Sequence, residues 1–130
     1  MMAPLGVDNA LVEVADLGAA LSHYQDVLGL QLRFRLSEPP LALLSIGDER
    51  PGLLIRQAAQ PVTGGMRLWL EVADAREAAA ELAGRGVNTL GEPFQVATGW
   101  TVEVADAWGN VVGLTDYTLR PELGRSTSAL

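Results

Sequence analysis

Hydrophobic and polar residues follow one another with two different periods along the chain. In two segments the apolar residues lie three or four apart, which is the spacing of one helix face. These segments predict a helix from Leu17 to Leu28 and a second from Ala75 to about Gly84. Shorter apolar runs, several alternating with polar residues, predict strands. The predicted strands cover about residues 10–14, 30–36, 41–46, 53–57, 68–72, 94–97, 100–105 and 111–115.

Both predicted helices carry signals for their ends. Asp16 and Asp74 each precede a helix, and their carboxylates can accept hydrogen bonds from the free amides of the first turn. Glycine is favoured where a helix ends in a left-handed residue. Gly29 stands at the end of the first helix, and Gly84 and Gly86 at the end of the second.

The two halves of the chain repeat one another. Glu13-Val14-Ala15-Asp16 recurs 58 residues later as Glu71-Val72-Ala73-Asp74, each time between a strand and a helix. The same offset relates the turns that begin at Asp48 and Asp106. Each half therefore reads β-α-β-β-β. We expect one α+β domain of 130 residues, with a first module at about 5–59, a linker at 60–65, a second module at about 66–118 and a flexible tail at 119–130.

Composition limits the class of protein. Hydrophobic residues make up 48% of the chain and charged residues 19%, so a packed core is expected. No apolar run reaches the roughly 18 residues of a membrane span, and residues 1–7 lack the pattern of a signal peptide. The sequence therefore predicts a cytoplasmic protein without a membrane partner. It contains no Cys, which excludes disulfides and thiolate chemistry.

The net charge is −7, from 9 Lys and Arg against 16 Asp and Glu. Such a field repels a nucleic-acid backbone, so we expect no DNA or RNA partner. The same charge would suit a cationic ligand, although acidic surfaces also serve solubility alone.

Two motifs on this repeat resemble the vicinal-oxygen-chelate superfamily, which includes glyoxalase I, the bleomycin-resistance proteins and the extradiol dioxygenases. The first is an apolar strand, then Val14-Ala15-Asp16, then a helix that ends in Tyr24-Gln25-Asp26-Val27-Leu28-Gly29-Leu30. The second is Asp106-Ala107-Trp108-Gly109-Asn110, which is similar to the family's Asp-Pro-x-Gly-Asn turn. The resemblance covers about residues 5–118. It implies two modules that form a curved mixed sheet around a small-molecule cleft, and a homodimer.

In metal-dependent members of that superfamily, four strand positions supply His, Glu or Gln ligands. The resemblance carries these positions onto Asn9, Ile55, Arg67 and Gly113. Arg67 is cationic, Ile55 and Gly113 have no donor side chain, and Asn9 is a single weak oxygen ligand. We therefore expect no metal site and no cofactor.

Strand alternation predicts which side chains would line the cleft that the resemblance implies. In each module, alternate residues of the first strand and of the last strand share the cleft side. Trp100, at the start of a later strand, either stacks at the rim of the cleft or is an exposed or partner-covered residue. Trp69 either offers a ring face to a ligand or fills the core. Arg33 and Arg56 are expected at the surface. The candidate ligand-binding residues are Asn9, Leu11, Glu13, Ile55, Arg67, Trp69, Glu71, Trp100 and Gly113.

Three functions remain open from the sequence. The favoured one is a metal-free binding protein that sequesters a planar or cationic, antibiotic-like molecule, as the resemblance to bleomycin-resistance proteins implies. The alternative is a lyase, isomerase or dioxygenase-type enzyme of the same superfamily, either metal-free or with ligands shared across a dimer. The third is an accessory domain whose cleft no longer functions.

Overall fold

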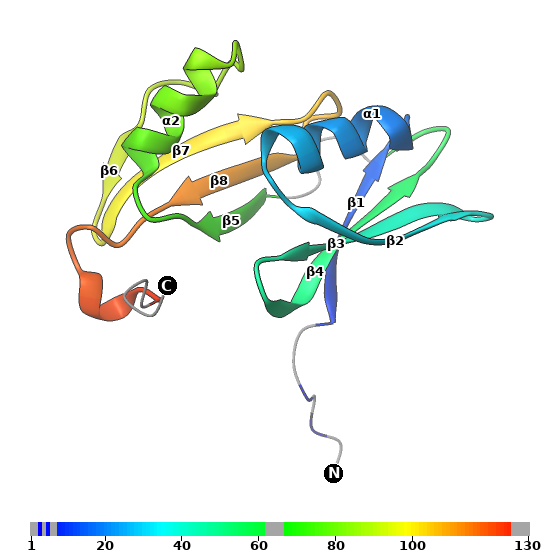
Figure 1. Ribbon diagram of the computed structural model, residues 1–130, viewed down its shortest axis with the longest axis horizontal. Coiled ribbons are helices and arrows are strands. Elements are labelled where there is room, and N and C mark those ends of the chain that lie inside the picture. Colours follow the sequence, from blue (N-terminus) through cyan, green and yellow to red (C-terminus); the bar gives the residue numbers. More distant parts are fainter. Residues whose placement is uncertain (1–2, 4, 6–7, 62–66, 126–130) are drawn as a thin grey trace. The chain divides into compact units, whose positions relative to one another are not determined.

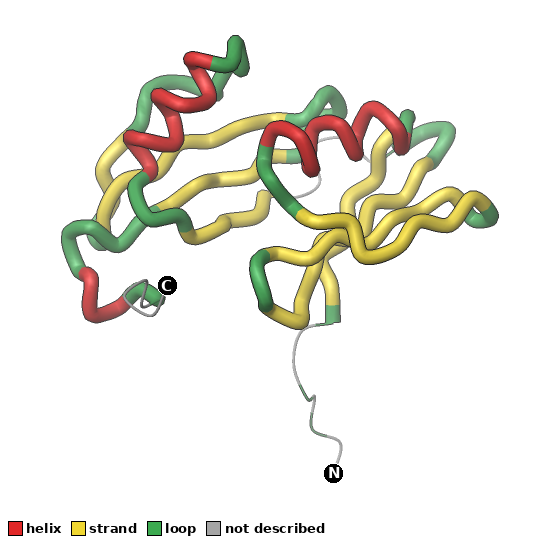
Figure 2. The backbone as a smooth tube through the Cα atoms, viewed as in Figure 1, coloured by secondary structure: helices red, strands yellow, loops and turns green. Residues whose placement is uncertain are grey.

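The computed structural model describes residues 3, 5, 8–61 and 67–125. The chain forms two compact units, Met1–Gly65 and Met66–Leu130. Each unit contains a four-stranded mixed sheet with one helical segment on one side of it (Figures 1 and 2).

In the first unit the strand order is β1-β4-β3-β2. Strand β1 (Asn9–Val14) runs parallel to β4 (Glu49–Gln57), which pairs antiparallel with β3 (Pro40–Ile46). Strand β3 pairs in turn with the edge strand β2 (Gln31–Ser37). The connection from β1 to β2 is the helix α1 (Leu17–Leu21), which continues as a π-helical segment, η1 (Ser22–Val27).

The second unit repeats this topology with the order β5-β8-β7-β6. Strand β5 (Arg67–Glu71) is parallel to β8 (Val111–Thr115), and β7 (Gly99–Ala105) lies antiparallel between β8 and β6 (Phe94–Val96). The helix α2 (Ala75–Gly84) follows β5, and a short 3-10 helix, η2 (Pro121–Leu123), comes after β8. The predicted fold class, an α+β fold with two tandem β-α-β-β-β modules, is thus confirmed.

One face of each sheet packs against the helix of its own unit, and the side chains between them form the core. In the first unit these include Val12, Val14, Leu17, Ala20, Tyr24, Ala42, Leu44, Leu53 and Ile55. In the second unit they include Ala75, Leu82, Val102, Val104, Val112 and Leu114. The opposite face of each sheet is not covered by α1 or α2, and we call it the open face.

The helix ends follow the signals in the sequence. The Asp16 carboxylate accepts a hydrogen bond from the Ala19 amide at 3.0 Å, and Asp74 accepts one from the Glu77 amide at 2.9 Å. Gly29 and Gly86 have φ angles of 75° and 76°, the left-handed region that a side chain would disfavour. Both predicted N-caps are confirmed, and so are Gly29 and Gly86 as left-handed residues after the helices, whereas Gly84 is the last residue of α2 and has no positive φ.

In addition to the N-cap, one polar side chain at the end of the last strand of each unit accepts a hydrogen bond from the first amide of the helix. Gln57, at the end of β4, accepts from the Leu17 amide at 2.8 Å. The equivalent residue after β8 is Asp116, which accepts from the Ala75 amide at 2.7 Å and also from Trp100 and Thr118. Asp116 is fully buried. Burial alone would raise the pKa of this carboxyl, but the hydrogen bonds together outweigh it and lower the pKa.

The segment after β8 follows a defined path as far as residue 125. The sequence predicts a flexible tail from residue 119, whereas here η2 forms and Arg125 contacts Glu71 through both its amide and its guanidinium. The remainder of that predicted tail, residues 126–130, lies outside the described residues. No helix within the described ranges is long and apolar enough to cross a membrane.

Candidate functional site

The open face of the first sheet carries an apolar row across all four strands. Register pairs join Leu11 to Leu54, Leu54 to Leu43, and Leu43 to Phe34. Leu11 and Phe34 are 41% and 45% exposed, so the row presents apolar surface to solvent. Such a surface is suited to the hydrophobic part of a small molecule.

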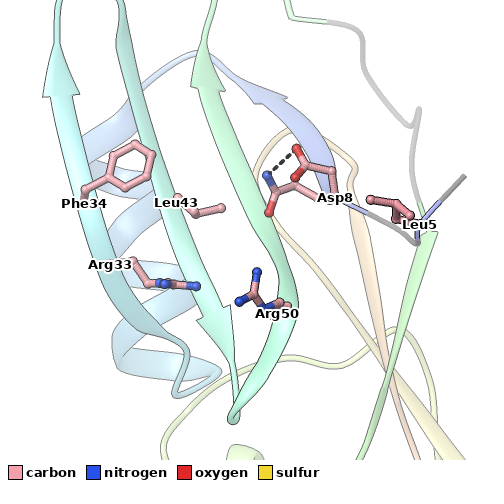
Figure 3. Close-up of a pocket in the computed structure, with 7 residues that line it drawn as sticks. Leu5, Asp8, Arg33, Phe34, Leu43 and Arg50 are labelled. Atoms are coloured by element: carbon pink, nitrogen blue, oxygen red, sulfur yellow. Dashed lines mark hydrogen bonds between the residues drawn. The ribbon is translucent and has the colours of Figure 1, made fainter.

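A pocket of about 720 Å³ opens beside this row (Figure 3). It is lined by Leu5, Asp8, Asn9, Arg33, Phe34, Leu43 and Arg50, which all belong to the first unit. Figure 3 shows the side chains of Arg33 and Arg50 directed toward each other, with Leu43 and Phe34 farther along the strands. The pocket therefore combines two guanidinium groups with an apolar wall.

A β-bulge in β2 turns Arg33 into this pocket. Leu32 pairs with Leu44 and Phe34 pairs with Leu43, so Arg33 is the extra residue between two consecutive pairs. A bulged strand places two residues opposite one and re-aims a side chain. Arg33 and Phe34 consequently line the same pocket although they are adjacent in sequence.

Asn9 has an internal role at the pocket wall. Its Oδ1 accepts a hydrogen bond from the Gly52 amide at 3.2 Å, which ties β1 to β4. Its Nδ2 donates to the Asp8 carboxylate at 3.1 Å, the dashed line in Figure 3. Asn9 thus shapes the pocket and holds the one carboxylate among the lining residues.

The open face of the second sheet has a different surface, in which Trp69 covers Gly113. The two residues are register partners on β5 and β8. A Cβ built on Gly113 would lie 2.6, 2.9 and 3.0 Å from Cε3, Cζ3 and Cδ2 of the indole. Because these distances are nearly equal, the position is above the ring plane and not beside its edge. The absent side chain lets Trp69 lie flat on the sheet, and Trp69 remains 46% exposed.

The glutamates on the open faces, Glu13, Glu71 and Glu103, are each paired with an arginine. Glu13 accepts from Arg56 at 2.6 Å on the first sheet. On the second sheet Arg67 pairs with Glu103. Glu71 accepts from the Arg125 guanidinium at 2.7 Å. These pairs leave little local negative field on the open faces, so the structure does not support the expectation of a cationic ligand.

Two candidate residues lie on the helix-facing side and not on the open face. Ile55 is fully buried and pairs with Val12, because equivalent residues of β4 and β8 are 59 apart in sequence and not 58. Leu54, the partner of Leu11, therefore takes the position that Ile55 was predicted to take. Trp100 lies beneath α2, with the Arg76 guanidinium 4.4 Å from its ring centre. Trp100 is therefore on the helix-facing side of β7 and not on the open face.

The other candidates lie on the open faces of their sheets. Sequence reasoning missed Arg33 as a pocket residue, because period two places it on the opposite side from the neighbouring apolar residues. It also missed Arg50, because the sequence predicts a turn from Asp48 and a strand only from residue 53, whereas β4 begins at Glu49.

The residues at the four ligand positions do not fit a metal ion. After the correction these positions hold Asn9, Leu54, Arg67 and Gly113, and Arg67 is committed to Glu103. In the part of the chain that the structure describes, no three His, Cys, Asp or Glu residues gather closely enough to bind one metal. A single amide oxygen is too weak a donor set for a stable site.

Comparison with known proteins places this geometry in a family. Residues 6–114 match the model of the Glyoxalase/Bleomycin resistance protein/Dioxygenase superfamily. No curated protein sequence matches the chain significantly.

Solved structures share the fold at low sequence identity. TnmS3, an antibiotic binding protein from Streptomyces sp. CB03234, is 24% identical, with a TM-score of 0.78 over 91% of this chain and 100% of that one. The lactoylglutathione lyase of Agrobacterium tumefaciens is 21% identical, with a TM-score of 0.72 over 90% and 97%. The bleomycin-binding protein of Streptomyces verticillus, complexed with copper(II)-bleomycin, is 23% identical, with a TM-score of 0.68 over 88% and 98%.

Proposed function

The chain belongs to the glyoxalase/bleomycin resistance protein/dioxygenase superfamily, and from this premise we propose that it is a small-molecule binding protein. It would sequester a planar, antibiotic-like organic molecule on its open sheet faces, without chemistry at a bound metal. Antibiotic resistance by sequestration is the corresponding biological role.

The observation that carries this proposal is the geometry of Trp69. Its indole rests flat on the backbone of Gly113, and 46% of the residue stays exposed. A ring held in this way offers a preformed flat surface for another planar ring, and little side-chain freedom is lost on binding. The exposed apolar row Leu11–Leu54–Leu43–Phe34 adds a second apolar surface.

Two of the structures with the same fold support the ligand class. One is an antibiotic binding protein and one holds copper(II)-bleomycin. A lyase shares the fold equally well, so the fold alone does not choose between binding and catalysis. The unsuitable donor set at the family's metal positions favours binding.

The test is a calorimetric titration with bleomycin, its copper(II) complex and planar aromatic antibiotics of positive, negative and zero charge. At least one is expected to bind the wild-type protein, and to be recovered unchanged by mass spectrometry. Trp69→Ala should weaken that binding roughly tenfold, the effect of losing about 1.4 kcal/mol of stacking. Trp100→Phe alters a Trp on the helix-facing side and should leave the affinity unchanged.

Three outcomes would contradict the proposal. They are the absence of binding across the whole set, equal affinity of wild type and Trp69→Ala, or conversion of the ligand to a product. The last of these would favour the enzyme alternative.

We also propose that the protein is a homodimer, as the resemblance implies. Exposed apolar side chains on the edge strand β2 that do not line the pocket, Leu32 and Leu36, support a subunit interface. Light scattering coupled to size-exclusion chromatography would return twice the 13.8 kDa chain mass for a dimer.

A further inference from the structure

We infer that the pocket of the first unit binds an anionic group of the ligand, such as a carboxylate or sulfonate, between Arg33 and Arg50. This inference rests on the proposed function, and it specifies the charge of the molecule that is bound. It is the opposite of the cationic ligand that the net charge of −7 leads one to expect.

The geometry brings the two guanidinium groups together from different strands. The bulge in β2 supplies Arg33, and the first residues of β4 supply Arg50. Both line one pocket of about 720 Å³, and Figure 3 shows the two side chains directed toward each other. A planar guanidinium presents several N–H donors in a fork that matches a carboxylate, and two such groups can hold one anion from two sides.

The electrostatic field at the pocket depends on which charged side chains are already neutralised by a partner. Arg56, Arg67 and Arg125 each pair with a glutamate on an open face. Among the residues that the structure describes, neither Arg33 nor Arg50 pairs with a carboxylate. Like charges brought together without a counter-ion repel each other, and a bound anion relieves that repulsion.

One carboxylate lies at the same pocket and has to be counted. Asp8 lines the wall, and the Asn9 amide group donates to it. Two positive charges therefore oppose one negative charge, and the local charge remains positive although the chain as a whole is acidic.

The remaining lining sets the rest of the ligand's chemistry. Phe34 and Leu43 form an apolar wall beside the arginines, and they belong to the apolar row of the open face. A molecule with an aromatic body and an anionic group at one end meets both surfaces at once. The structure thus selects an anionic amphiphile over a cation or a purely polar anion.

Two fluorescent probes with the same aromatic skeleton test this inference. 8-Anilinonaphthalene-1-sulfonate carries a sulfonate, and N-phenyl-1-naphthylamine lacks it. We expect the sulfonate probe to bind the full-length protein more tightly, and its affinity to fall with added NaCl. Arg33→Gln and Arg50→Gln should each weaken the sulfonate probe by roughly fivefold, about 1 kcal/mol. Neither variant should change the affinity for the neutral probe.

Arg35→Gln is the matched control. Arg35 lies on the same strand as Arg33 but pairs with the buried Ala42, so it belongs to the helix-facing side and should leave both affinities unchanged. Equal weakening by all three variants would mean that net charge alone acts, and would overturn the inference. So would equal affinity of the wild-type protein for the two probes.

These outcomes are distinct from failure of the proposed function. If both probes bind equally and Trp69→Ala weakens both, the protein is a binding protein without an anion site. If neither probe binds, and no member of the antibiotic set binds either, the proposed function itself fails.

Discussion

A side chain at position 113 would occupy the space of the Trp69 ring. Gly113 does not have a positive φ, so its backbone accepts any residue and only the contact with Trp69 opposes a Cβ. The pair therefore behaves as a unit in which a small residue holds a large one flat. Leu11 and Leu54 occupy the equivalent positions of the first module, and no such stacking is possible there.

Gly113→Ala is accordingly predicted to tilt the indole away from the sheet. The new Cβ would lie within 3.0 Å of three ring atoms, closer than real contacts allow. The expected result is a shift of the intrinsic Trp emission and a loss of affinity similar to that of Trp69→Ala. Gly84→Ala is the control, since nothing lies within 4 Å of a Cβ there. Unchanged emission in Gly113→Ala would show that Trp69 does not depend on this glycine.

At the scale of elements, Asp116 joins three parts of the second module. It accepts hydrogen bonds from the first residue of α2, from β7 and from Thr118, all while buried. Its counterpart Gln57 makes the same bond to Leu17 as a neutral amide. The two modules thus bind the first amide of the helix in the same way, but only the carboxylate of Asp116 can be protonated at low pH.

Asp116→Asn is predicted to lower the free energy of unfolding by about 1–3 kcal/mol at pH 7, because an NH₂ group would face the Ala75 donor. The folded-state pKa of Asp116 is depressed below its ordinary value of 3.8. Its contribution to stability is therefore complete above about pH 4 and is lost as the pH falls through the lower folded value. Urea unfolding at pH 7 and pH 3 should show a smaller acid loss in the variant. An equal loss in both proteins would contradict this role.

The sequence predicts the elements well because their signals are local. The N-cap of Asp16, the left-handed Gly29 and the period-two strands depend only on near neighbours. The pocket depends on strand register, which is a non-local property. One extra residue in β2 turns Arg33 inward, and the interval from β1 to β4 is one residue shorter than that from β5 to β8, which moves Ile55 to the core. Neither difference in length leaves a mark in hydrophobicity, so repeat offset and alternation placed these two residues wrongly.

Deleting Arg33 tests the role of the bulge as a separable insertion. Leu32 and Phe34 would keep their partners Leu44 and Leu43, so the sheet register can persist. We expect a folded protein, checked by circular dichroism, whose affinity for the sulfonate probe falls as much as in Arg33→Gln. A protein that retains full affinity would show that the guanidinium at this position is not used.

At the scale of the whole molecule, the two modules share a topology and differ on their open faces. The first module presents Arg33 and Arg50 beside an apolar row, and the second presents Trp69 on Gly113. The net charge of −7 describes neither surface, because Glu13, Glu71 and Glu103 pair with arginines and Arg33 and Arg50 outnumber Asp8 at the pocket. Local pairing, and not total charge, determines which ligand an open face attracts.

The side chains at the four family metal positions predict how the stability of the protein responds to added metal ions. A site filled at 100 times its dissociation constant would add about 2.7 kcal/mol to stability. In a domain of this size that corresponds to a rise of several degrees in Tm. Because Asn9, Leu54, Arg67 and Gly113 offer one amide oxygen between them, we expect no rise in Tm when Zn²⁺, Ni²⁺, Mn²⁺ or Fe²⁺ is added.

Elemental analysis before and after dialysis against a chelator should find less than about a tenth of a metal per chain, since a site this poor in donors binds weakly. Near-stoichiometric metal, removed by the chelator with a fall in Tm, would mean that other residues form a site and that metal-dependent catalysis is the function to pursue.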